Sequence, residues 1–299
     1  MKKQAILIIV HKNTYVLEKN LQLLDSPNSD IFIHVDRKCK NFKYDFYRSL
    51  VKYSSIIYLN RRIDVRWAGF SQIQVEIALI ESAMNYSEYS YLHLISGQDM
   101  IVSPIDTIVK ECDKSNKIYL DSIKITNKNK WEKKVYQRIS VKHIMIKYVS
   151  NHNLIKQYIS RLFNRVFANI QVYCGIDLVK KNDISIRYGS NWFSIPNDCA
   201  KYILTNKKKI NNYFRNGWLV DELFMQSIIA ENKEFEKRLV PNKRFIKWNS
   251  KQKGHPCILK CKDLNEIKKA NMFFARKFDE NIDKKVIDEL YKSILKEEK

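Results

Sequence analysis

The 299-residue chain is poor in glycine and proline, with six and five respectively, and has no low-complexity segment or internal repeat. This scarcity argues against long flexible linkers, so one compact domain over residues 1–299 is expected. No apolar run is long enough to cross a bilayer, and the run over residues 5–10 is shorter than the apolar core of a signal peptide. We therefore expect this run to form the first β-strand.

Short motifs that hold metals or phosphates are also missing. No Walker phosphate loop or G-x-G-x-x-G is present, which removes the main support for an ATPase or a Rossmann dinucleotide-binding protein. No two aspartates lie two positions apart, so no Asp-x-Asp can share a metal ion. The six cysteines are scattered without a C-x-x-C pair, which favours reduced thiols. His255, Cys257 and Cys261 form a loose cluster that lacks a fourth ligand and the usual zinc spacing.

Positive charge, in contrast, is abundant and unevenly placed. The formal net charge is +22, and residues 122–181 alone carry +11. Such a field attracts polyanions, and we weigh three interpretations: a solvated basic surface, a contact with an anionic membrane, or nucleic-acid binding. No RNA- or DNA-binding motif appears, so nucleic acid is not an expected partner.

Strand-like and helical patterns alternate in the first 121 residues. The strand-like runs, rich in Ile, Tyr and Val, cover residues 5–11, 30–36, 55–60, 91–96 and 117–121. Helical apolar spacing covers residues 14–24 and 71–84. This alternation predicts an α/β fold with a mostly parallel central sheet and helices on both faces.

Ligands of such sheets bind beyond the carboxyl ends of the strands. The polar residues that close the predicted strands are therefore expected to converge on one rim: His11, Lys12, His34, Asp36, Asn60, Arg61, Arg62, Gln98 and Asp99. Because the set includes two histidines and two aspartates, a metal ion at this rim is one alternative.

The second half of the chain completes the pattern. Residues 122–150 are basic and weakly periodic, and residues 153–170 predict an amphipathic helix with its apolar face opposite Lys156, Arg161 and Arg165. The other expected elements are a strand or hairpin at 186–196, helices from about 197 and 220, a strand at 245–248 and a helix from about 283.

Three stretches carry candidate chemistry. In LISGQD, Asp99 is expected to hold a loop or a sugar hydroxyl rather than a metal. In VDEL, Asp221 and Glu222 are either acids favoured by the first turn of a helix or a source of a general base. In FFARKFDE, Arg276 and Lys277 either face water or neutralise a diphosphate leaving group without a metal.

The order of the motifs HKN, IHVDRK, VRWAGFS, LISGQD, YGSNWF, VDELFMQ, RFIKW and FARKFD over residues 6–280 resembles the core-2/I-branching N-acetylglucosaminyltransferase family, glycosyltransferase family 14. The chain looks like a short bacterial member without the membrane anchor and stem of the Golgi enzymes. The resemblance implies a GT-A-type fold and inverting transfer from a UDP-sugar without a metal. The expected donor is UDP-N-acetylglucosamine, with UDP-xylose, UDP-glucose or UDP-galactose as alternatives.

The resemblance also implies roles for single residues. Glu222 matches the family's catalytic base, and Lys277 matches its diphosphate-binding lysine. Donor binding is expected from His11, Asp36, Arg66, Arg276, Lys277 and His255. Acceptor binding is expected from Asp99, Trp192 and Trp248. One departure concerns the second diphosphate-binding cation, whose place falls near Gly254 and His255, so Lys251, Lys253 or His255 is expected to replace it.

These expectations divide the domain into a nucleotide-sugar-binding half, residues 1–121, and an acceptor-binding and catalytic half, residues 122–299. The expected acceptor is a glycan or a lipid-linked oligosaccharide in surface polysaccharide synthesis. The expected location is cytoplasmic, with a peripheral contact between residues 122–181 and the anionic inner face of the plasma membrane. The rival hypothesis is a non-enzymatic polyanion-binding protein.

Overall fold

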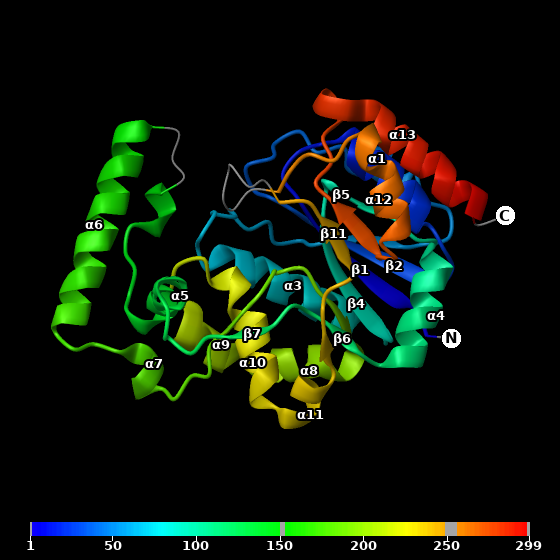
Figure 1. The fold of residues 1–299 in the computed structure, drawn as a ribbon. Coiled ribbons are helices and arrows are strands. Elements are labelled where there is room, and N and C mark those ends of the chain that lie inside the picture. The colour runs from blue at the N-terminus through cyan, green and yellow to red at the C-terminus, as the bar shows by residue number, and fades with distance from the viewer. Residues whose placement is uncertain (1, 150–152, 249–255, 298–299) are drawn as a thin grey trace.

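A computed structural model describes residues 2–149, 153–248 and 256–297, and a seven-stranded sheet lies at its centre (Figure 1). The strand order is β10-β6-β9-β4-β1-β2-β3. The bounds of these strands are β1 Gln4–Val10, β2 Ser29–Val35, β3 Ile56–Tyr58, β4 Tyr91–Ser96, β6 Ile118–Tyr119, β9 Ser194–Pro196 and β10 Leu239–Val240. Strands β1 to β4 pair in parallel, whereas β9 runs antiparallel to both of its neighbours. The sheet thus takes strands from both halves of the chain.

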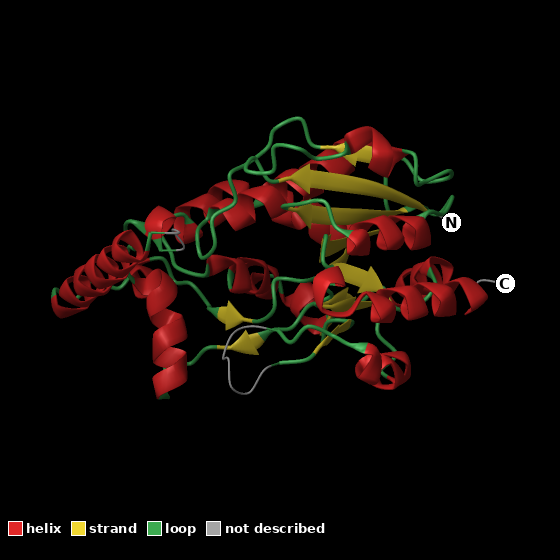
Figure 2. Cartoon of the chain, turned by 90° about the horizontal axis from the view of Figure 1, so that it is seen from above, coloured by secondary structure: helices red, strands yellow, loops and turns green. Residues whose placement is uncertain are grey.

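Helices cover both faces of this sheet (Figure 2). One face packs against α1 Tyr15–Leu24, α4 Ile105–Ser115, α12 Leu264–Lys269 and α13 Glu280–Glu297. The other packs against α3 Ser71–Tyr86, α5 Lys130–Ser140, α8 Asn197–Thr205, α9 Lys207–Phe214 and α10 Phe224–Glu231. Because β1 and β2 are buried at nearly every residue, they fit a sheet that is covered on both sides. The predicted α/β class with a mostly parallel sheet is confirmed.

A second sheet, in the order β11-β12-β5, places the end of LISGQD next to the C-terminal FARKFD motif. Its strands are β5 Asp99–Ile101, β11 Arg244–Ile246 and β12 Phe274–Arg276. Arg244 joins the two sheets, because its buried guanidinium donates to Ser194 Oγ at 2.9 Å and to the Leu94 carbonyl at 3.3 Å. Gly97 lies between β4 and β5, where a Cβ atom would approach Val10 Cγ1 to 3.0 Å. This glycine is thus explained by close packing on β1.

The basic segment forms a lobe beside the sheet. It contains the strand β7 Ile123–Lys124, the helix α5 and a 3-10 turn at Ile146–Tyr148. The strand β7 pairs with β8 Arg187–Tyr188. The long helix α6 Leu154–Tyr173 stands at the edge of the molecule, followed by α7 Leu178–Lys181 (Figure 1). Short elements complete the described chain: α2 Tyr44–Arg48, α11 Lys233–Lys237 and the 3-10 turns Val220–Glu222 and Cys261–Asp263. No described helix is both long and apolar enough to span a membrane.

Most elements lie where the sequence predicted them, with three corrections. The stretch 186–196 is not a hairpin, because β8 and β9 belong to different sheets. The helix expected from about residue 220 begins as a 3-10 turn, and α10 starts only at Phe224. The weakly periodic stretch 122–150 contains the well-formed helix α5, which Asn129 caps by accepting a hydrogen bond from the Glu132 amide. A polar helix of this kind escapes detection by hydrophobic spacing alone.

The tight packing of Gly189 gives a test of the fold around the pocket described below. A Cβ atom on Gly189 would lie 1.9 Å from the Asp121 carbonyl oxygen, so Gly189→Ala forces the backbone apart. We expect a loss of about 3 kcal/mol in the free energy of unfolding, measured by urea denaturation. The comparison variant is Gly175→Ala, where φ is +74° and no atom lies within 4 Å. It is expected to lose only about 1 kcal/mol, and equal losses would contradict the packing argument.

Candidate active site

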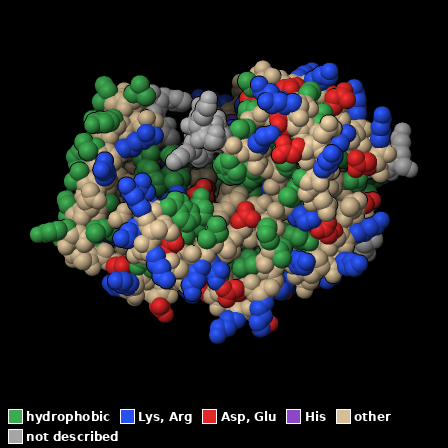
Figure 3. Space-filling model, viewed as in Figure 1, with side chains coloured by type: hydrophobic (Ala, Val, Ile, Leu, Met, Phe, Trp, Pro, Cys, Tyr) green, Lys and Arg blue, Asp and Glu red, His purple; other side chains and the backbone are tan. Residues whose placement is uncertain are grey.

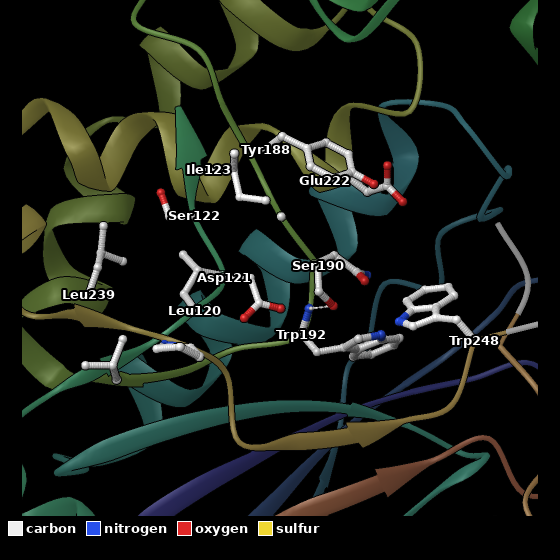
Figure 4. Close-up of a pocket in the computed structure, with 14 residues that line it drawn as sticks. Leu120, Asp121, Ser122, Ile123, Tyr188, Ser190, Trp192, Glu222, Leu239 and Trp248 are labelled. Atoms are coloured by element: carbon white, nitrogen blue, oxygen red, sulfur yellow. Dashed lines mark hydrogen bonds between the residues drawn. The ribbon is translucent and has the colours of Figure 1, made fainter. Parts of the chain in front are cut away.

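A pocket of about 540 Å³ opens beyond the end of β6 (Figure 4). Three residues proposed from the sequence line it together: Glu222, Trp192 and Trp248. Figure 4 shows the two indole rings next to each other, with the Glu222 and Tyr188 side chains across the pocket. The loop that bears Gly189 forms part of the wall, since its amide donates to the Glu222 carbonyl at 3.0 Å. The pocket therefore combines a carboxylate with the flat aromatic surfaces on which sugar rings can stack.

The Glu222 carboxylate is held by neighbours from two other elements. Its Oε2 atom accepts a hydrogen bond from Arg138 Nη1 of α5 at 2.6 Å, and 32% of the side chain remains exposed. The Arg138 guanidinium also lies 5.5 Å from the centre of the Tyr188 ring. Burial and the Glu222 carboxylate raise the pKa of the Tyr188 hydroxyl. Glu222 is thus oriented toward the pocket by an arginine and accompanied by a protonated phenol.

Two further carboxyl groups lie buried behind Glu222. Asp221 accepts a hydrogen bond from Gln72 Nε2 at 2.9 Å, and burial together with the charge of Glu222 raises its pKa to about 7. Glu76 of α3 is completely buried, and burial, with the charge of Asp221 added, raises its pKa well above the ordinary value. Burial therefore disfavours ionisation of both groups. The carboxyl groups that line the pocket itself are those of Glu222 and Asp121.

The pocket is joined to the FARKFD strand through one cation. The Arg276 guanidinium lies 4.0 Å from the centre of the Trp192 ring, and its Nε atom lies 3.5 Å from Asp99 Oδ1. Asp99 and Arg276 face each other in the register of β5 and β12. The Asp99 Oδ2 atom also accepts a hydrogen bond from the Ser96 amide at 2.7 Å. Asp99 is buried and holds a loop and a cation, the first of the two roles left open by the sequence.

The expected donor-binding residues form a basic patch next to Arg276. Lys277 is half-buried, and burial and the charge of Arg276 lower its pKa. His11 interacts electrostatically with Lys12, Lys277 and Asp36. Partial burial is the main cause that lowers its pKa, and the two lysine charges add to this effect. His11, Lys12 and Asp36 follow β1 and β2 and lie close together, as predicted for this part of the rim, and Lys277 joins them from the end of β12.

Asp36 and Arg66 are linked to each other by a chain of ion pairs. Asp36 is buried, accepts a hydrogen bond from the Lys38 amide at 2.8 Å and lies 3.3 Å from Lys38 Nζ. Lys38 Nζ also contacts Asp64, which pairs with Arg66 at 2.6 Å. Arg66 Nη1 then donates to the Lys147 carbonyl at 3.1 Å and connects the patch with the basic lobe.

Other residues proposed from the sequence do not take part in this arrangement. His34 is buried, and its Nε2 atom accepts a hydrogen bond from the Ile63 amide at 2.9 Å, so it does not face the rim. Within residues 2–149, 153–248 and 256–297, no three His, Cys, Asp or Glu side chains cluster closely enough to hold a metal ion. Three expected substitutes for the second diphosphate-binding cation, Lys251, Lys253 and His255, lie outside the described residues.

Three residues of the site were not identified from the sequence. Arg138 and Tyr188 surround Glu222, and Asp121 lines the pocket while accepting two hydrogen bonds from Asn242. Asp121 closes the strand β6, so the rule that placed the other rim residues at strand ends also covers it. Arg138 carries no such signal, because its stretch shows only basic residues with weak periodicity.

The chain matches a known protein family over most of its length. The family model "Branch: Core-2/I-Branching enzyme" matches residues 5–272. The chain belongs to the Core-2/I-Branching enzyme family. The family expected from the sequence is confirmed.

The similar curated proteins are distant in sequence. Xylosyltransferase sqv-6 of Caenorhabditis briggsae is 22% identical over 93% of this chain and 35% of its own length. A human beta-1,3-galactosyl-O-glycosyl-glycoprotein beta-1,6-N-acetylglucosaminyltransferase is 22% identical over 93% of this chain and 66% of its own length. The chain thus spans about a third of the first relative and about two thirds of the second.

Solved glycosyltransferase structures are similar over most of the chain. The bifunctional glycosyltransferase WbbM aligns with a TM-score of 0.46 and 10% identity, over 92% of this chain and 46% of its own. Mouse xyloside xylosyltransferase 1 aligns with a TM-score of 0.40 and 9% identity, over 91% of this chain and 96% of its own. Similarity at this level does not inform the site. The α/β architecture seen here agrees with the GT-A-type fold expected from the sequence.

The buried Asp221 makes a pH-dependent contribution to stability. Because its pKa is about 7 in the folded chain against an ordinary 3.8, the folded chain keeps a proton that the unfolded chain releases between these values. The free energy of unfolding should therefore fall as pH rises from about 4 to about 7, by up to roughly 4 kcal/mol from this group. Asp221→Asn should remove that part of the fall, as measured by urea unfolding at several pH values. The exposed Asp45→Asn serves as control, and identical pH profiles for the two variants would refute the assignment.

Proposed function

We propose that the chain transfers a sugar from a UDP-sugar to a glycan hydroxyl, with inversion at the anomeric carbon and without a metal ion. The supporting observation is that Glu222 shares a pocket with Trp192, whose ring contacts Arg276 next to Lys277. A base for the acceptor and cations for the leaving group therefore lie on two sides of one aromatic side chain.

In the proposed reaction, Glu222 takes the proton of an acceptor hydroxyl. The acceptor oxygen forms a bond with the anomeric carbon while the bond from that carbon to the diphosphate oxygen breaks, and its electron pair leaves with UDP. Arg138 orients Glu222 through the 2.6 Å contact before the acceptor arrives. Trp192 and Trp248 supply the apolar surface on which the acceptor sugar lies.

The departing diphosphate is assigned to Lys277 and its neighbours. Burial, followed by repulsion from Arg276 and Lys12, lowers the pKa of Lys277. A bound diphosphate would relieve the repulsion, because each anionic oxygen can accept a charge-assisted hydrogen bond. His11 and Asp36 are proposed to contact the uridine end of the donor, and Arg66 to support them from the adjoining ion-pair chain.

For the donor sugar we propose N-acetylglucosamine, with xylose, glucose or galactose as alternatives to be compared directly. One curated relative is named a β-1,6-N-acetylglucosaminyltransferase and another a xylosyltransferase, which supports the first two choices. The proposed acceptor is a glycan or lipid-linked oligosaccharide of surface polysaccharide synthesis. The proposed setting is the cytoplasmic face of an anionic membrane, for which the charge of the basic lobe is the main support.

Glu222→Gln tests the catalytic base. The substitution keeps the shape of the side chain but cannot accept the hydroxyl proton, so we expect the transfer rate to fall about 10²- to 10⁴-fold, with UDP binding preserved. The matched control is Glu231→Gln on α10, which removes a carboxylate paired with Lys209 on the neighbouring helix. Turnover like that of the wild type in Glu222→Gln would contradict the assignment.

Lys277→Ala tests the metal-free diphosphate site. Calorimetric titration with UDP in the presence of EDTA should show binding by the wild type and binding about 10- to 100-fold weaker in the variant. The control is Lys284→Ala on α13, where the ammonium contacts the Tyr15 ring instead. Binding that appears only after manganese is added would overturn the metal-free proposal and favour a metal at the rim.

A further inference from the structure

The long helix α6 faces the rest of the molecule with its polar side. Its three buried side chains are Ser160, Asn164 and Gln171. Ser160 Oγ donates to the Met145 carbonyl at 2.7 Å, and the Gln171 amide exchanges hydrogen bonds of 3.0 Å and 2.8 Å with the backbone of Lys142. The helix is therefore attached to the protein through hydrogen bonds rather than through an apolar core.

The opposite side of α6 is apolar and exposed. Ten large apolar side chains of α6 are each between 42% and 93% exposed: Leu154, Ile155, Tyr158, Ile159, Leu162, Phe163, Val166, Ile170, Val172 and Tyr173. Figure 3 shows hydrophobic side chains gathered along the edge of the molecule over α6, with Lys and Arg side chains beside them. Helices on a protein surface normally show the reverse orientation, with the apolar stripe toward the core. A contiguous exposed apolar surface of this kind marks a site of interaction.

Cations flank this apolar side. The described helix has no acidic residue, and its charged side chains are Lys156, Arg161 and Arg165. Arg161 and Arg165 also line a cavity of about 700 Å³ that lies between α5 and α6. Lys134 and Arg138 of α5 contribute to the same cavity, and none of its described lining residues is a carboxylate. Four cationic side chains thus surround a space at the border of the apolar surface.

We propose that α6 lies on an anionic phospholipid membrane, with its apolar side in the lipid and lipid phosphate groups in the α5–α6 cavity. A partner that offers apolar chains and negative phosphates side by side fits both halves of this surface. The net charge of +11 over residues 122–181 supports lipid over a second copy of the chain, because two such lobes repel each other. This membrane contact rests on the proposed function, because it names the surface at which the transferase would work.

Arg138 links the α5–α6 cavity to the pocket that contains Glu222. It lines the α5–α6 cavity and also donates to Glu222 at 2.6 Å, so the phosphate site adjoins the pocket of the catalytic base. A membrane-bound orientation would therefore hold that pocket close to the lipid surface. An acceptor carried by a lipid could reach Glu222 without leaving the membrane.

Vesicle co-sedimentation tests the proposal. At physiological salt the wild type should bind phosphatidylcholine vesicles that contain phosphatidylglycerol and should not bind pure phosphatidylcholine vesicles. Ile155→Asp with Phe163→Asp should lower the partition coefficient at least about tenfold. Arg161→Glu with Arg165→Glu should lower it at least about 25-fold, since each cation near an anionic surface contributes roughly a fivefold factor.

Matched variants keep the test specific. Ile282→Asp alters an exposed apolar residue of α13, and Lys110→Glu with Lys114→Glu reverses two exposed charges one helical turn apart on α4. Both controls should partition within about twofold of the wild type, and thermal unfolding should confirm that all variants fold. The proposal is overturned if the wild type ignores anionic vesicles or if controls and α6 variants lose binding equally.

Two more outcomes would also overturn it. A wild-type dimer that Ile155→Asp with Phe163→Asp dissociates, seen by sedimentation velocity, would make this side an interface between copies. Calorimetric binding of inorganic diphosphate to the cavity, lost in the Arg161 and Arg165 variant but unaccompanied by vesicle binding, would assign the cations to a soluble ligand. If instead the vesicle results are as expected while UDP does not bind, the proposed transferase function fails and the membrane surface stands.

Discussion

The site depends on the antiparallel pairing of β5 with β12, which sets Asp99 opposite Arg276. The Arg276 side chain is only 14% exposed, and a guanidinium with so little water around it is stable only when a nearby acid and a suitable surface compensate for the lost water. Asp99 supplies the acid and Trp192 supplies the surface, at 3.5 Å and 4.0 Å respectively. Since Lys277 follows Arg276 directly, this one pairing fixes the proposed leaving-group cation relative to the pocket that contains Glu222.

The balance of charge around the pocket assigns different roles to similar groups. The carboxyl groups of Glu76, Asp221 and Glu222 lie one after another between the helix α3 and the pocket, and burial disfavours ionisation of the first two. Of these three, only Glu222 has an arginine partner and lines the pocket. The cations also differ in exposure: Arg276 and Lys277 are partly buried, whereas Arg161 and Arg165 are exposed at the lobe. Burial therefore determines which groups hold the structure and which can meet a ligand.

Much of this was predictable from the sequence, because the relevant signals are local. The strands β1 to β4 and the helices α1 and α3 follow directly from hydrophobic spacing, and the ordered motifs indicated the family and drew attention to Glu222 and Lys277. The contact of Arg276 with Trp192 was not predictable, since it joins residues 84 positions apart through a sheet that no local pattern reveals. The orientation of α6 escaped for a related reason: spacing shows that a helix has an apolar side but not whether that side faces the core.

The position of UDP in a crystal of this chain tests the central claim most directly. The account predicts the diphosphate within hydrogen-bonding distance of Lys277, on the side of Trp192 that contacts Arg276, with the uracil toward His11 and Asp36. Glu222 should then face the anomeric side of a bound UDP-sugar across the pocket. Diphosphate bound among Lys134, Arg161 and Arg165 in the α5–α6 cavity, with the Lys277 patch empty, would contradict the account.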